Sequence, residues 1–493
     1  MKPTNLTKIE STITTTKSHS TKNYYEHRIK QNGFTLEQLG GENKVHSPDI
    51  TNVKVNGKEV ESKEFNPETN DRNIKISFSI QDEKESNLDI VGYKVFVKGV
   101  PLHGQYMKKF EKPEKSKTIE EEITLSALAD IGDNLGDNSI ELMGYTKDGV
   151  ESSKYKFELN YKGKDNEKKG SLYVVTFGTK IYDSGKKSDL PDLSYPVKDA
   201  EDLQNLFLEK NKKESTYEKV IPIILKDEEI TRKKLNEIRK ELNKSSVDDT
   251  VIFFVSGHGM RADTRLEIAE RLAKEFGITQ SIGDSLTNSD SANVYYYMTS
   301  NSTTDSPWEN GIPMEAFRFA LNEIKARQKI LLLDTCQSGE KVVLSGYKPS
   351  KQRIEEIEKL IESYNEKGEE KGIRRIKGSD KEELENYLIS IAYEWELREL
   401  AKMFPELRRG TGTIEISAAS GSQSALESDK WQNGAFTYTI KEAIIDDKAK
   451  DGENITGKSL RRYILDRVER LTQGRQIPMV TRDIPGRDFR VTK

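Results

Sequence analysis

The single cysteine of this 493-residue chain and one of its histidines stand in matching sequence contexts. Cys336 follows the apolar run of residues 330–333, and His258 follows the apolar run of residues 251–255; small residues surround both. A free thiol has a pKa of about 8.5, and a nearby imidazole can activate it and later protonate a leaving amine. The pattern predicts Cys336 as a nucleophile and His258 as its general base, with no third member of a triad evident. The plainer alternatives are a packing cysteine and a core or turn-forming histidine.

Strands and helices alternate from residue 171 onward and would position these two residues. Apolar runs at 171–178, 219–225, 250–257, 329–333 and 413–418 predict strands, and the segments between them carry apolar positions at helical spacing. Ala200, Leu203, Leu206 and Phe207 share one helical face, as do the apolar residues of segment 231–243. This order predicts an α/β domain with a mostly parallel sheet. Reactive groups of such sheets lie beyond the carboxyl ends of the strands, where His258 and Cys336 stand.

The part of the chain before residue 171 has a different character. Residues 1–46 form a polar arm, for which we expect little order. Residues 47–162 contain short alternating runs and the turn signals Asn56-Gly57 and Asp148-Gly149, which predict an all-β sandwich of immunoglobulin or fibronectin type. Residues 163–170 are expected to be a charged linker, which leaves 171–493 for the α/β domain.

The bulk composition limits the kind of partner. Lys+Arg and Asp+Glu total 79 and 83, a formal net charge of −4, so no overall field draws nucleic acid or an anionic membrane. No apolar run approaches the ~20 residues that span a bilayer, and the N-terminus does not read as a secretory signal. One cysteine permits neither an internal disulfide nor a multi-cysteine zinc site. We therefore expect a soluble, cytoplasmic protein that acts on a small molecule or a protein.

These residues resemble the caspase-like cysteine peptidases, in particular the prokaryotic caspase-like and metacaspase branch. The hallmarks are a strand ending in Ser-Gly-His-Gly at 256–259 and a strand ending in Asp-Thr-Cys-Gln-Ser-Gly at 334–339. The resemblance extends through segments 194–207, 410–428, 431–444 and 476–489. It implies a bacterial peptidase of the C14 type, and bacterial members commonly carry a β-sandwich before the peptidase domain. Defence, cell death and proteolytic signalling are the roles that the family suggests.

The resemblance also implies roles for individual residues. The backbone N–H groups of Gly259 and Cys336 would form the oxyanion hole, and the substrate would bind as an extended strand. Asp199, Ser256 and Asp334 carry over to the pocket for the residue before the scissile bond, and two acids with a hydroxyl predict Arg or Lys there. For Asp334 the structural alternative is a strand-end cap, and for Asp199 it is a helix N-terminal acid.

Two segments depart from the family pattern. One is a polar insertion at residues 261–291, and the other is a charged connector at about 341–409. The connector contains Arg374, Arg375 and Lys377, which a pocket for basic residues would accept, so self-cleavage is predicted there; the alternative is an uncut helical hairpin. Arg408 and Arg409 adjoin the next strand and should be better protected.

Calcium is a candidate cofactor, because metacaspases often use it, although none is required by the dyad chemistry. The chain lacks the Asp-rich spacing of a calcium loop, and Asp248-Asp249 and Asp446-Asp447 are interpreted as solvated loop acids, so no metal site is assigned.

Two classes of function remain at the level of sequence. The first is a cysteine endopeptidase that cleaves proteins after Arg or Lys and is held inactive, as a zymogen, until a signal or partner arrives. The second is a catalytically silent scaffold whose β-sandwich binds a regulatory protein partner. The intact His258 and Cys336 favour the first. A serine hydrolase is disfavoured, because no G-x-S-x-G motif is present.

Overall fold

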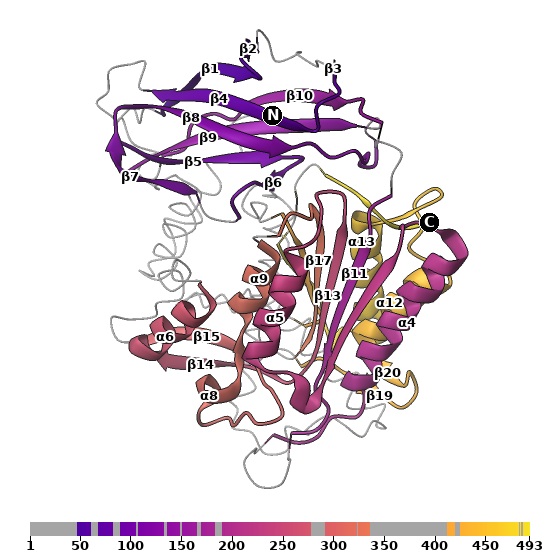
Figure 1. The fold of residues 1–493 in the computed structure, drawn as a ribbon. Helices are drawn as coiled ribbons and strands as arrows, with labels where there is room; N and C mark the ends of the chain where they lie inside the picture. Colours follow the sequence, from indigo (N-terminus) through magenta and orange to yellow (C-terminus); the bar gives the residue numbers. More distant parts are fainter. Residues whose placement is uncertain are drawn as a thin grey trace, which may run out of the picture. The chain divides into compact units, whose positions relative to one another are not determined.

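A six-stranded sheet is built from the apolar runs of the second half of the chain in the computed structural model (Figure 1). The strand order is β12-β11-β13-β17-β18-β22, and every neighbouring pair is parallel except β18 with β22. Strands β11, β13, β17 and β18 are buried along their whole length, as expected for a sheet that is covered on both faces. The predicted parallel sheet is confirmed. Its strands are β11 Leu172–Gly178, β12 Val220–Lys226, β13 Thr250–Gly257, β17 Gln328–Thr335, β18 Ile414–Ser417 and β22 Met479–Arg482.

The described part of the chain belongs to one compact unit, Val45–Glu340 with Arg408–Lys493. The polar arm 1–46 and the connector 341–409, with its predicted cleavage sites Arg374, Arg375 and Lys377, lie outside the described residues. So do the Asp148-Gly149 turn and Cys336 itself. The structure describes residues 47–60, 68–81, 89–104, 107–132, 136–147, 150–164, 169–182, 190–277, 291–322, 324–335, 412–419, 424–482, 484 and 487–493.

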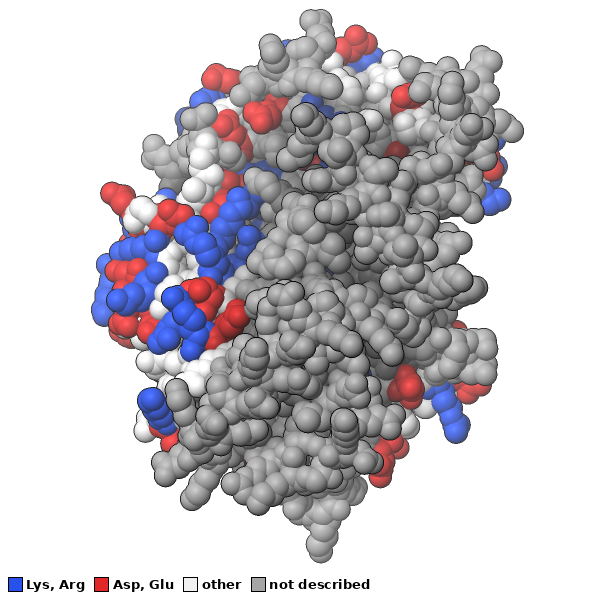
Figure 2. Space-filling model, turned by 180° about the vertical axis from the view of Figure 1, so that it is seen from behind, with Lys and Arg blue, Asp and Glu red and all other residues white. Residues whose placement is uncertain are grey.

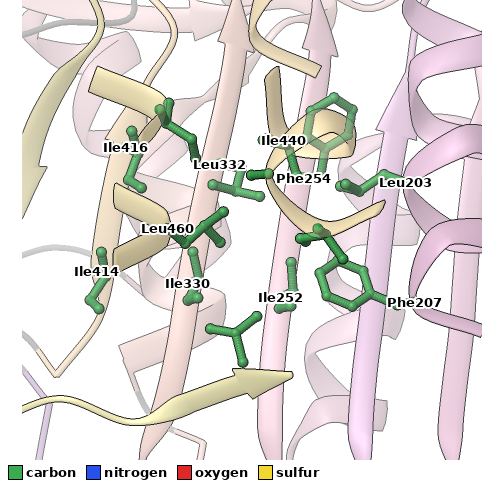
Figure 3. Packing of buried hydrophobic residues seen from close by; sticks show 14 of the residues in the cluster. Leu203, Phe207, Ile252, Phe254, Ile330, Leu332, Ile414, Ile416, Ile440 and Leu460 are labelled. Atoms are coloured by element: carbon green, nitrogen blue, oxygen red, sulfur yellow. The ribbon is translucent and has the colours of Figure 1, made fainter. Parts of the chain in front are cut away.

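Helices cover both faces of this sheet (Figure 1). On one face the predicted stripe of Leu203 and Phe207 packs against Ile252 and Phe254, and apolar residues of two further helices complete the cluster (Figure 3). On the other face the predicted stripe of segment 231–243 is buried against odd-numbered residues of the same strands. The helices of the first face are α4 Pro196–Glu214, α12 Ala435–Ile445 and α13 Gly457–Leu471, and those of the second are α5 Arg232–Leu242 and α9 Met314–Asn322.

The alternation of side chains along the strands decides which polar groups share a face. Even-numbered residues of β13 and β17, such as Ile252 and Ile330, point to the layer of α4, α12 and α13. Ser256 and Asp334 continue these two rows at the carboxyl ends of the strands and are partners in the parallel register. Both side chains therefore face the layer that contains α4 and α12.

The first part of the predicted polar insertion forms a strand and a helix with an apolar face. Residues 261–265 belong to β14, which pairs with β15, and residues 266–276 form helix α6. Helix α6 buries Ala269, Leu272 and Phe276, because these residues recur at helical spacing. Residues 278–290 lie outside the described residues. The elements are β14 Gly259–Arg265, α6 Leu266–Phe276, β15 Ser291–Tyr297 and β16 Ile312–Pro313, joined in the order β14-β15-β16.

Short elements complete the α/β region. Two of them, β19 and β20, form a hairpin that leads directly into α12. They are η1 Asp227–Glu229, α8 Pro307–Asn310, β19 Glu427–Ser428, β20 Asn433–Gly434, β21 Ile455–Thr456 and β23 Arg490–Thr492.

The N-terminal β-rich region contains two sheets that share one buried cluster. Asn56 and Gly57 both have positive φ, 48° and 81°, and form the predicted tight turn between β1 and β2. Strands β7 and β8 were not predicted, because the inward-facing Glu121 interrupts the apolar alternation of β8. The immunoglobulin or fibronectin type of this region remains a prediction. The sheets are β2-β1-β4-β8 and β3-β10-β9-β5-β6 with β7 on β5, and the strands are β1 Asp49–Val55, β2 Lys58–Glu59, β3 Glu68–Thr69, β4 Asn73–Gln81, β5 Ile90–Val97, β6 Val100–Pro101, β7 Lys108–Glu114, β8 Ser116–Thr124, β9 Asp137–Thr146 and β10 Tyr155–Tyr161.

A buried lysine near the start of β17 leads to a stability prediction. Lys329 is 1% exposed, and its Nζ donates to the Leu321 carbonyl at 2.9 Å. Burial, followed by the neighbouring cations Arg487 and Arg327, lowers the pKa of Lys329 to about 7. Between pH 7 and the ordinary lysine pKa the unfolded chain binds more protons than the folded chain, so this residue makes stability rise with pH in that window. Below pH 7 Lys329 is charged in both the folded and the unfolded chain, so the buried charge lowers the free energy of unfolding by its full amount.

We expect Lys329→Met to raise the free energy of unfolding at pH 6, since the charged group is removed from the core. The advantage of the variant over wild type should shrink by roughly 3 kcal/mol between pH 6 and pH 9. Denaturant unfolding of both proteins at the two pH values measures this difference, and the comparison cancels all other titrating groups. A variant that is less stable than wild type by the same amount at both pH values would contradict the prediction.

Candidate active site

The strands that carry the predicted catalytic pair are neighbours in the sheet. β13 and β17 are parallel, and their register pairs Ser256 with Asp334 and Gly257 with Thr335. His258 directly follows β13, and Cys336 is the chain neighbour of Thr335, the last residue of β17. The structure thus confirms the strand pairing on which the prediction depended. Cys336 itself lies outside the described residues.

His258 is held by three hydrogen bonds. Its backbone N–H donates to Tyr182 Oη at 2.7 Å, and its carbonyl accepts from Met298 N at 3.0 Å. Its Nε2 lies 2.8 Å from the carbonyl oxygen of Pro191. A carbonyl can only accept, so Nε2 carries the hydrogen and the neutral ring presents Nδ1 as its basic atom.

The Pro191 carbonyl is the orienting group that sequence reasoning missed. It accepts the hydrogen on Nε2 and so restricts the orientation of the His258 ring. No side-chain pattern could have revealed it, because a backbone carbonyl is present at every position and only the path of the chain brings this one to the ring.

Burial sets the charge state of His258. The half-buried ring loses hydration, which lowers the pKa of His258 below its ordinary value, while the Pro191 carbonyl and the charge of Glu427 act in the opposite direction. The imidazole is therefore mostly neutral at pH 7, as a general base must be.

The segment that presents Pro191 is fastened to the β19–β20 hairpin. Glu427 accepts from Ser194 N at 2.8 Å and from Tyr195 N at 3.2 Å through its two carboxylate oxygens. Tyr195 Oη donates to Asp429 at 2.6 Å. Asp192 accepts from Tyr182 N at 2.8 Å. These contacts give the Pro191 carbonyl a defined position beside the imidazole ring.

Asp199 and Asp334 come together at the carboxyl end of the sheet. Asp199, in the first turn of α4, is 1% exposed, and Asp334, near the end of β17, is 5% exposed. Both border Gly434, where an added Cβ would lie 2.7 Å from Asp334 Oδ2 and 3.2 Å from Asp199 Oδ2. The predicted pocket residues are therefore close neighbours, and Ser256 stands opposite Asp334 on the same face of the sheet.

The contacts of the two carboxylates are with neutral donors. Asp199 Oδ1 accepts from Asn433 Nδ2 at 2.7 Å and from Gly434 N at 3.2 Å. Asp334 Oδ2 accepts from Thr437 Oγ1 at 2.9 Å. No lysine or arginine within the described ranges forms an ion pair with either acid. Gly434 and Thr437 stand at the start of α12, so the two acids also accept hydrogen bonds from donors at the beginning of that helix.

The pKa values of both acids reflect this environment. Burial raises the pKa of Asp199 well above its ordinary value, and the nearby Asp334 raises it further. Burial likewise raises the pKa of Asp334, against the opposing hydrogen bond from Thr437. Acids with raised pKa values keep a proton to higher pH than exposed acids do, and a bound cation would favour its release.

The residue before Cys336 is anchored from the side of the small sheet. Thr335 Oγ1 lies 2.8 Å from Tyr295 Oη, and the Arg261 guanidinium stands 5.5 Å above the ring centre of Tyr295. Tyr297 Oη donates to the Ser256 carbonyl at 3.0 Å. The tyrosines of β15 thus contact the ends of β13 and β17, and Arg261, the first residue of the predicted insertion, packs on one of these tyrosines.

One interpretation of acidic residues was wrong. Asp248 and Asp249 are buried rather than solvated: Asp248 Oδ1 accepts from Ser126 Oγ at 2.6 Å, and Asp249 Oδ1 accepts from Ser171 N at 2.7 Å. Turn backbone and hydroxyl donors compensate their burial, together with the Arg72 guanidinium, which pairs with Asp248. Asp446 is exposed, as predicted, and Asp447 pairs with Lys210 and Lys450.

The described surface carries charges of both signs (Figure 2). Figure 2 shows acidic and basic side chains interspersed where one face is described. Within the described ranges no group of three or more His, Cys, Asp or Glu side chains could hold a metal ion, and no helix is long and apolar enough to cross a membrane.

Solved structures give weak likenesses only. The chain matches fibronectin(III)-like modules of CbhA from Clostridium thermocellum with a TM-score of 0.16 and 14% identity, over 24% of this chain and 48% of that one. It matches a Niemann-Pick type C2 protein from Japanese carpenter ant with a TM-score of 0.16 and 10% identity, over 24% and 94%. A polysaccharide deacetylase from Bacillus cereus gives 0.13 and 11%, over 58% and 81%.

Comparison with protein families gives a clear result, whereas the search of curated proteins finds no match. The model of the caspase domain matches residues 172–489, which include β13, β17 and the acidic pair. Because this match covers well over half of the chain, the protein belongs to the caspase domain family of peptidases, Peptidase_C14.

Proposed function

We propose that this protein is a cysteine endopeptidase that cleaves proteins after Arg or Lys, with His258 as general base and Cys336 as nucleophile. Membership of the caspase domain family indicates a cysteine peptidase in general terms. The finer assignment is supported above all by one observation: a buried pair of carboxylates, Asp199 and Asp334, stands without a cation among the described residues at the end of the catalytic strands.

The charge of the pocket favours a basic substrate side chain. A guanidinium or ammonium group that enters beside Asp199 and Asp334 would supply the missing counter-charge. It would replace the proton that the acids keep because their pKa values are raised. Ser256, on the same face, adds a hydroxyl acceptor. An acidic side chain would meet two carboxylates and is expected to be excluded.

The catalytic steps follow from the proposed roles. His258 Nδ1 takes the thiol proton, the Cys336 thiolate attacks the scissile carbonyl, and the imidazolium then protonates the leaving amine. Water, deprotonated by the same imidazole, hydrolyses the thioester and restores the thiol. Nε2 stays bonded to the Pro191 carbonyl throughout, which keeps the ring in one orientation.

Backbone register supports the proposed oxyanion donor Gly259. In an antiparallel pair, directly opposed residues alternate between hydrogen-bonded and non-bonded pairs. The His258 carbonyl accepts from Met298 N, so the next pair, Gly259 with Tyr297, is of the non-bonded kind. The Gly259 N–H thus points away from β15, which leaves it available to a substrate oxyanion together with the Cys336 N–H.

Regulation and location are further parts of the proposal. The N-terminal β-rich region is proposed to bind a regulatory protein partner, and the enzyme is proposed to act in the cytoplasm on protein substrates, as a zymogen that a signal activates and without a required cofactor. A calcium requirement is tested by adding the ion and a chelator to the same assay.

Self-processing is predicted within the connector, because its basic residues match the proposed pocket. Intact-mass spectrometry of the purified chain should show fragments that end at Arg374, Arg375 or Lys377. The matched Cys336→Ala protein should remain intact. An active wild-type protein that stays in one piece would refute self-cleavage without affecting the peptidase proposal.

One experiment tests the class and the specificity together. Pure protein is incubated with fluorogenic peptides that end in Arg, Lys or Asp, with and without calcium, beside Cys336→Ala. Turnover of the basic peptides by wild type alone supports the proposal. Preferred cleavage after Asp would reject the pocket assignment. Turnover of no peptide, even after limited proteolysis that would activate a zymogen, would favour the silent scaffold.

A further inference from the structure

Tyr182 touches the proposed general base at two places. Its Oη accepts the His258 backbone N–H at 2.7 Å, and its ring packs on the imidazole with the ring centres 4.6 Å apart and the planes tilted by 54°. The tyrosine is fully buried in a small apolar cluster with Leu272, Tyr296 and Met298. A large side chain that is packed on all sides has few alternative positions, so its contacts also restrict the position of His258.

The backbone around His258 is shaped to admit this tyrosine. Gly257 has φ of 150°, and a Cβ added there would lie 2.6 Å from Tyr182 Oη. Any side chain at residue 257 would therefore displace the hydroxyl. The glycine in the Ser-Gly-His-Gly segment thus serves the approach of Tyr182 as well as the turn.

The backbone N–H of Tyr182 contacts the segment that contains the Pro191 carbonyl. Its backbone N–H donates to Asp192 Oδ1 at 2.8 Å, and Asp192 adjoins Pro191, whose carbonyl lies 2.8 Å from His258 Nε2. Tyr182 therefore contacts the backbone N–H of His258, the face of its imidazole ring, and the segment whose Pro191 carbonyl lies beside Nε2. These three contacts leave the imidazole little freedom to rotate or shift.

We propose that Tyr182 is a positioning residue for His258, which holds the imidazole in the orientation that turns Nδ1 toward the thiol of Cys336. The proposal rests on the proposed peptidase function. Loss of the hydroxyl would leave the His258 N–H buried without its acceptor, so the backbone would shift to find another. Small displacements of a catalytic group reduce the rate strongly, while the substrate pocket at Asp199 and Asp334 is untouched.

The first test is kinetic and uses Tyr182→Phe, which removes a single oxygen atom and keeps the ring. We expect kcat to fall by roughly 10- to 100-fold with little change in KM. Tyr296→Phe is the matched control: this tyrosine is equally buried in the same cluster, but its Oη contacts Thr264 Oγ1 at 2.8 Å. Equal losses in both variants would mean general loosening of the cluster and would overturn the proposal.

The second test needs no turnover. The imidazole of His258 is titrated by NMR, with its signal assigned by His258→Gln. The pKa of His258 should lie below the ordinary value in wild type and in Tyr296→Phe, and it should move up in Tyr182→Phe as the loosened ring gains water. Asp192→Ala, at an exposed position, provides a second variant and should shift kcat and the titration in the same direction.

The outcomes separate this proposal from the proposed function. If wild type cleaves peptides but neither Tyr182→Phe nor Asp192→Ala changes kcat or the titration, positioning by Tyr182 is refuted and the peptidase stands. If wild type cleaves nothing, the peptidase proposal fails, and a shifted His258 titration in Tyr182→Phe still supports the positioning contact.

Discussion

His258→Ala and Cys336→Ala are each expected to lower kcat by three orders of magnitude or more on peptides that the wild type cleaves. Removal of the nucleophile abolishes the thioester route, and removal of the base leaves a thiol that is only a few per cent ionised at neutral pH. The double variant should be no worse than either single variant, because the two groups act in one step. Initial rates on the best basic peptide measure all three.

Structural integrity must be checked beside these rates. His258 is half-buried at the end of β13, and truncation there is a local change, so the melting temperature should stay close to that of wild type. Tyr296→Phe serves as a variant of a nearby buried residue with its activity retained. Residual turnover within about tenfold of wild type in either alanine variant would refute the dyad.

Neutralising one pocket acid should have the second large effect. Asp334→Asn or Asp199→Asn should lower kcat/KM for Arg and Lys peptides by a factor of hundreds or more, since a buried cation that loses its carboxylate forfeits roughly 3–5 kcal/mol. Peptides that carry citrulline in place of Arg measure the contribution of charge. Wild type should prefer Arg strongly, and the variants should lose most of that preference.

The neighbouring Asp202 offers a matched control on the same helix. It already pairs with Lys198 and Lys441, at 2.6 Å for Lys198, so Asp202→Asn should leave the preference for Arg nearly intact. Gly434→Ala keeps both acids but places a methyl group against them, 2.7 Å from Asp334 Oδ2, so the carboxylates must shift and KM should rise. Unchanged preference in both pocket variants would show that Asp199 and Asp334 serve only the start of α12.

The pH dependence of KM follows from the same pair. Because the pKa of each acid is raised in the empty pocket, a proton must leave before a cation can pair with them. Affinity for basic peptides should therefore improve as pH rises through neutrality, and KM for the citrulline peptide should not follow this trend. The two peptides compared on one enzyme separate the pocket from the titration of His258.

The strands of the parallel sheet and the place of His258 and Cys336 beyond their carboxyl ends could be predicted from the residues alone. The apolar runs at 251–255 and 330–333 predicted strands buried on both faces, which the structure confirms, and His258 and Cys336 follow them in the sequence. Helical faces such as that of Leu203 and Phe207 were equally readable, because burial imposes a period on the residue types. Buried strands and apolar helix faces involve residues that are close in sequence, so the order of residue types predicts them.

The contacts between segments that are distant in sequence became evident only in the folded structure. The Pro191 carbonyl carries no side-chain signal, and Tyr182 is one of 20 tyrosines until its hydroxyl is seen at the His258 N–H. Strand β8 was not predicted, because its inward-facing Glu121, which binds Tyr93 and Lys108, breaks the apolar alternation. The interpretation of Asp248 as a solvated acid was wrong, because its donor Ser126 lies more than a hundred residues away in the sequence. In each case a polar group is satisfied by a partner far along the chain, and that compensation becomes visible only when the chain has folded.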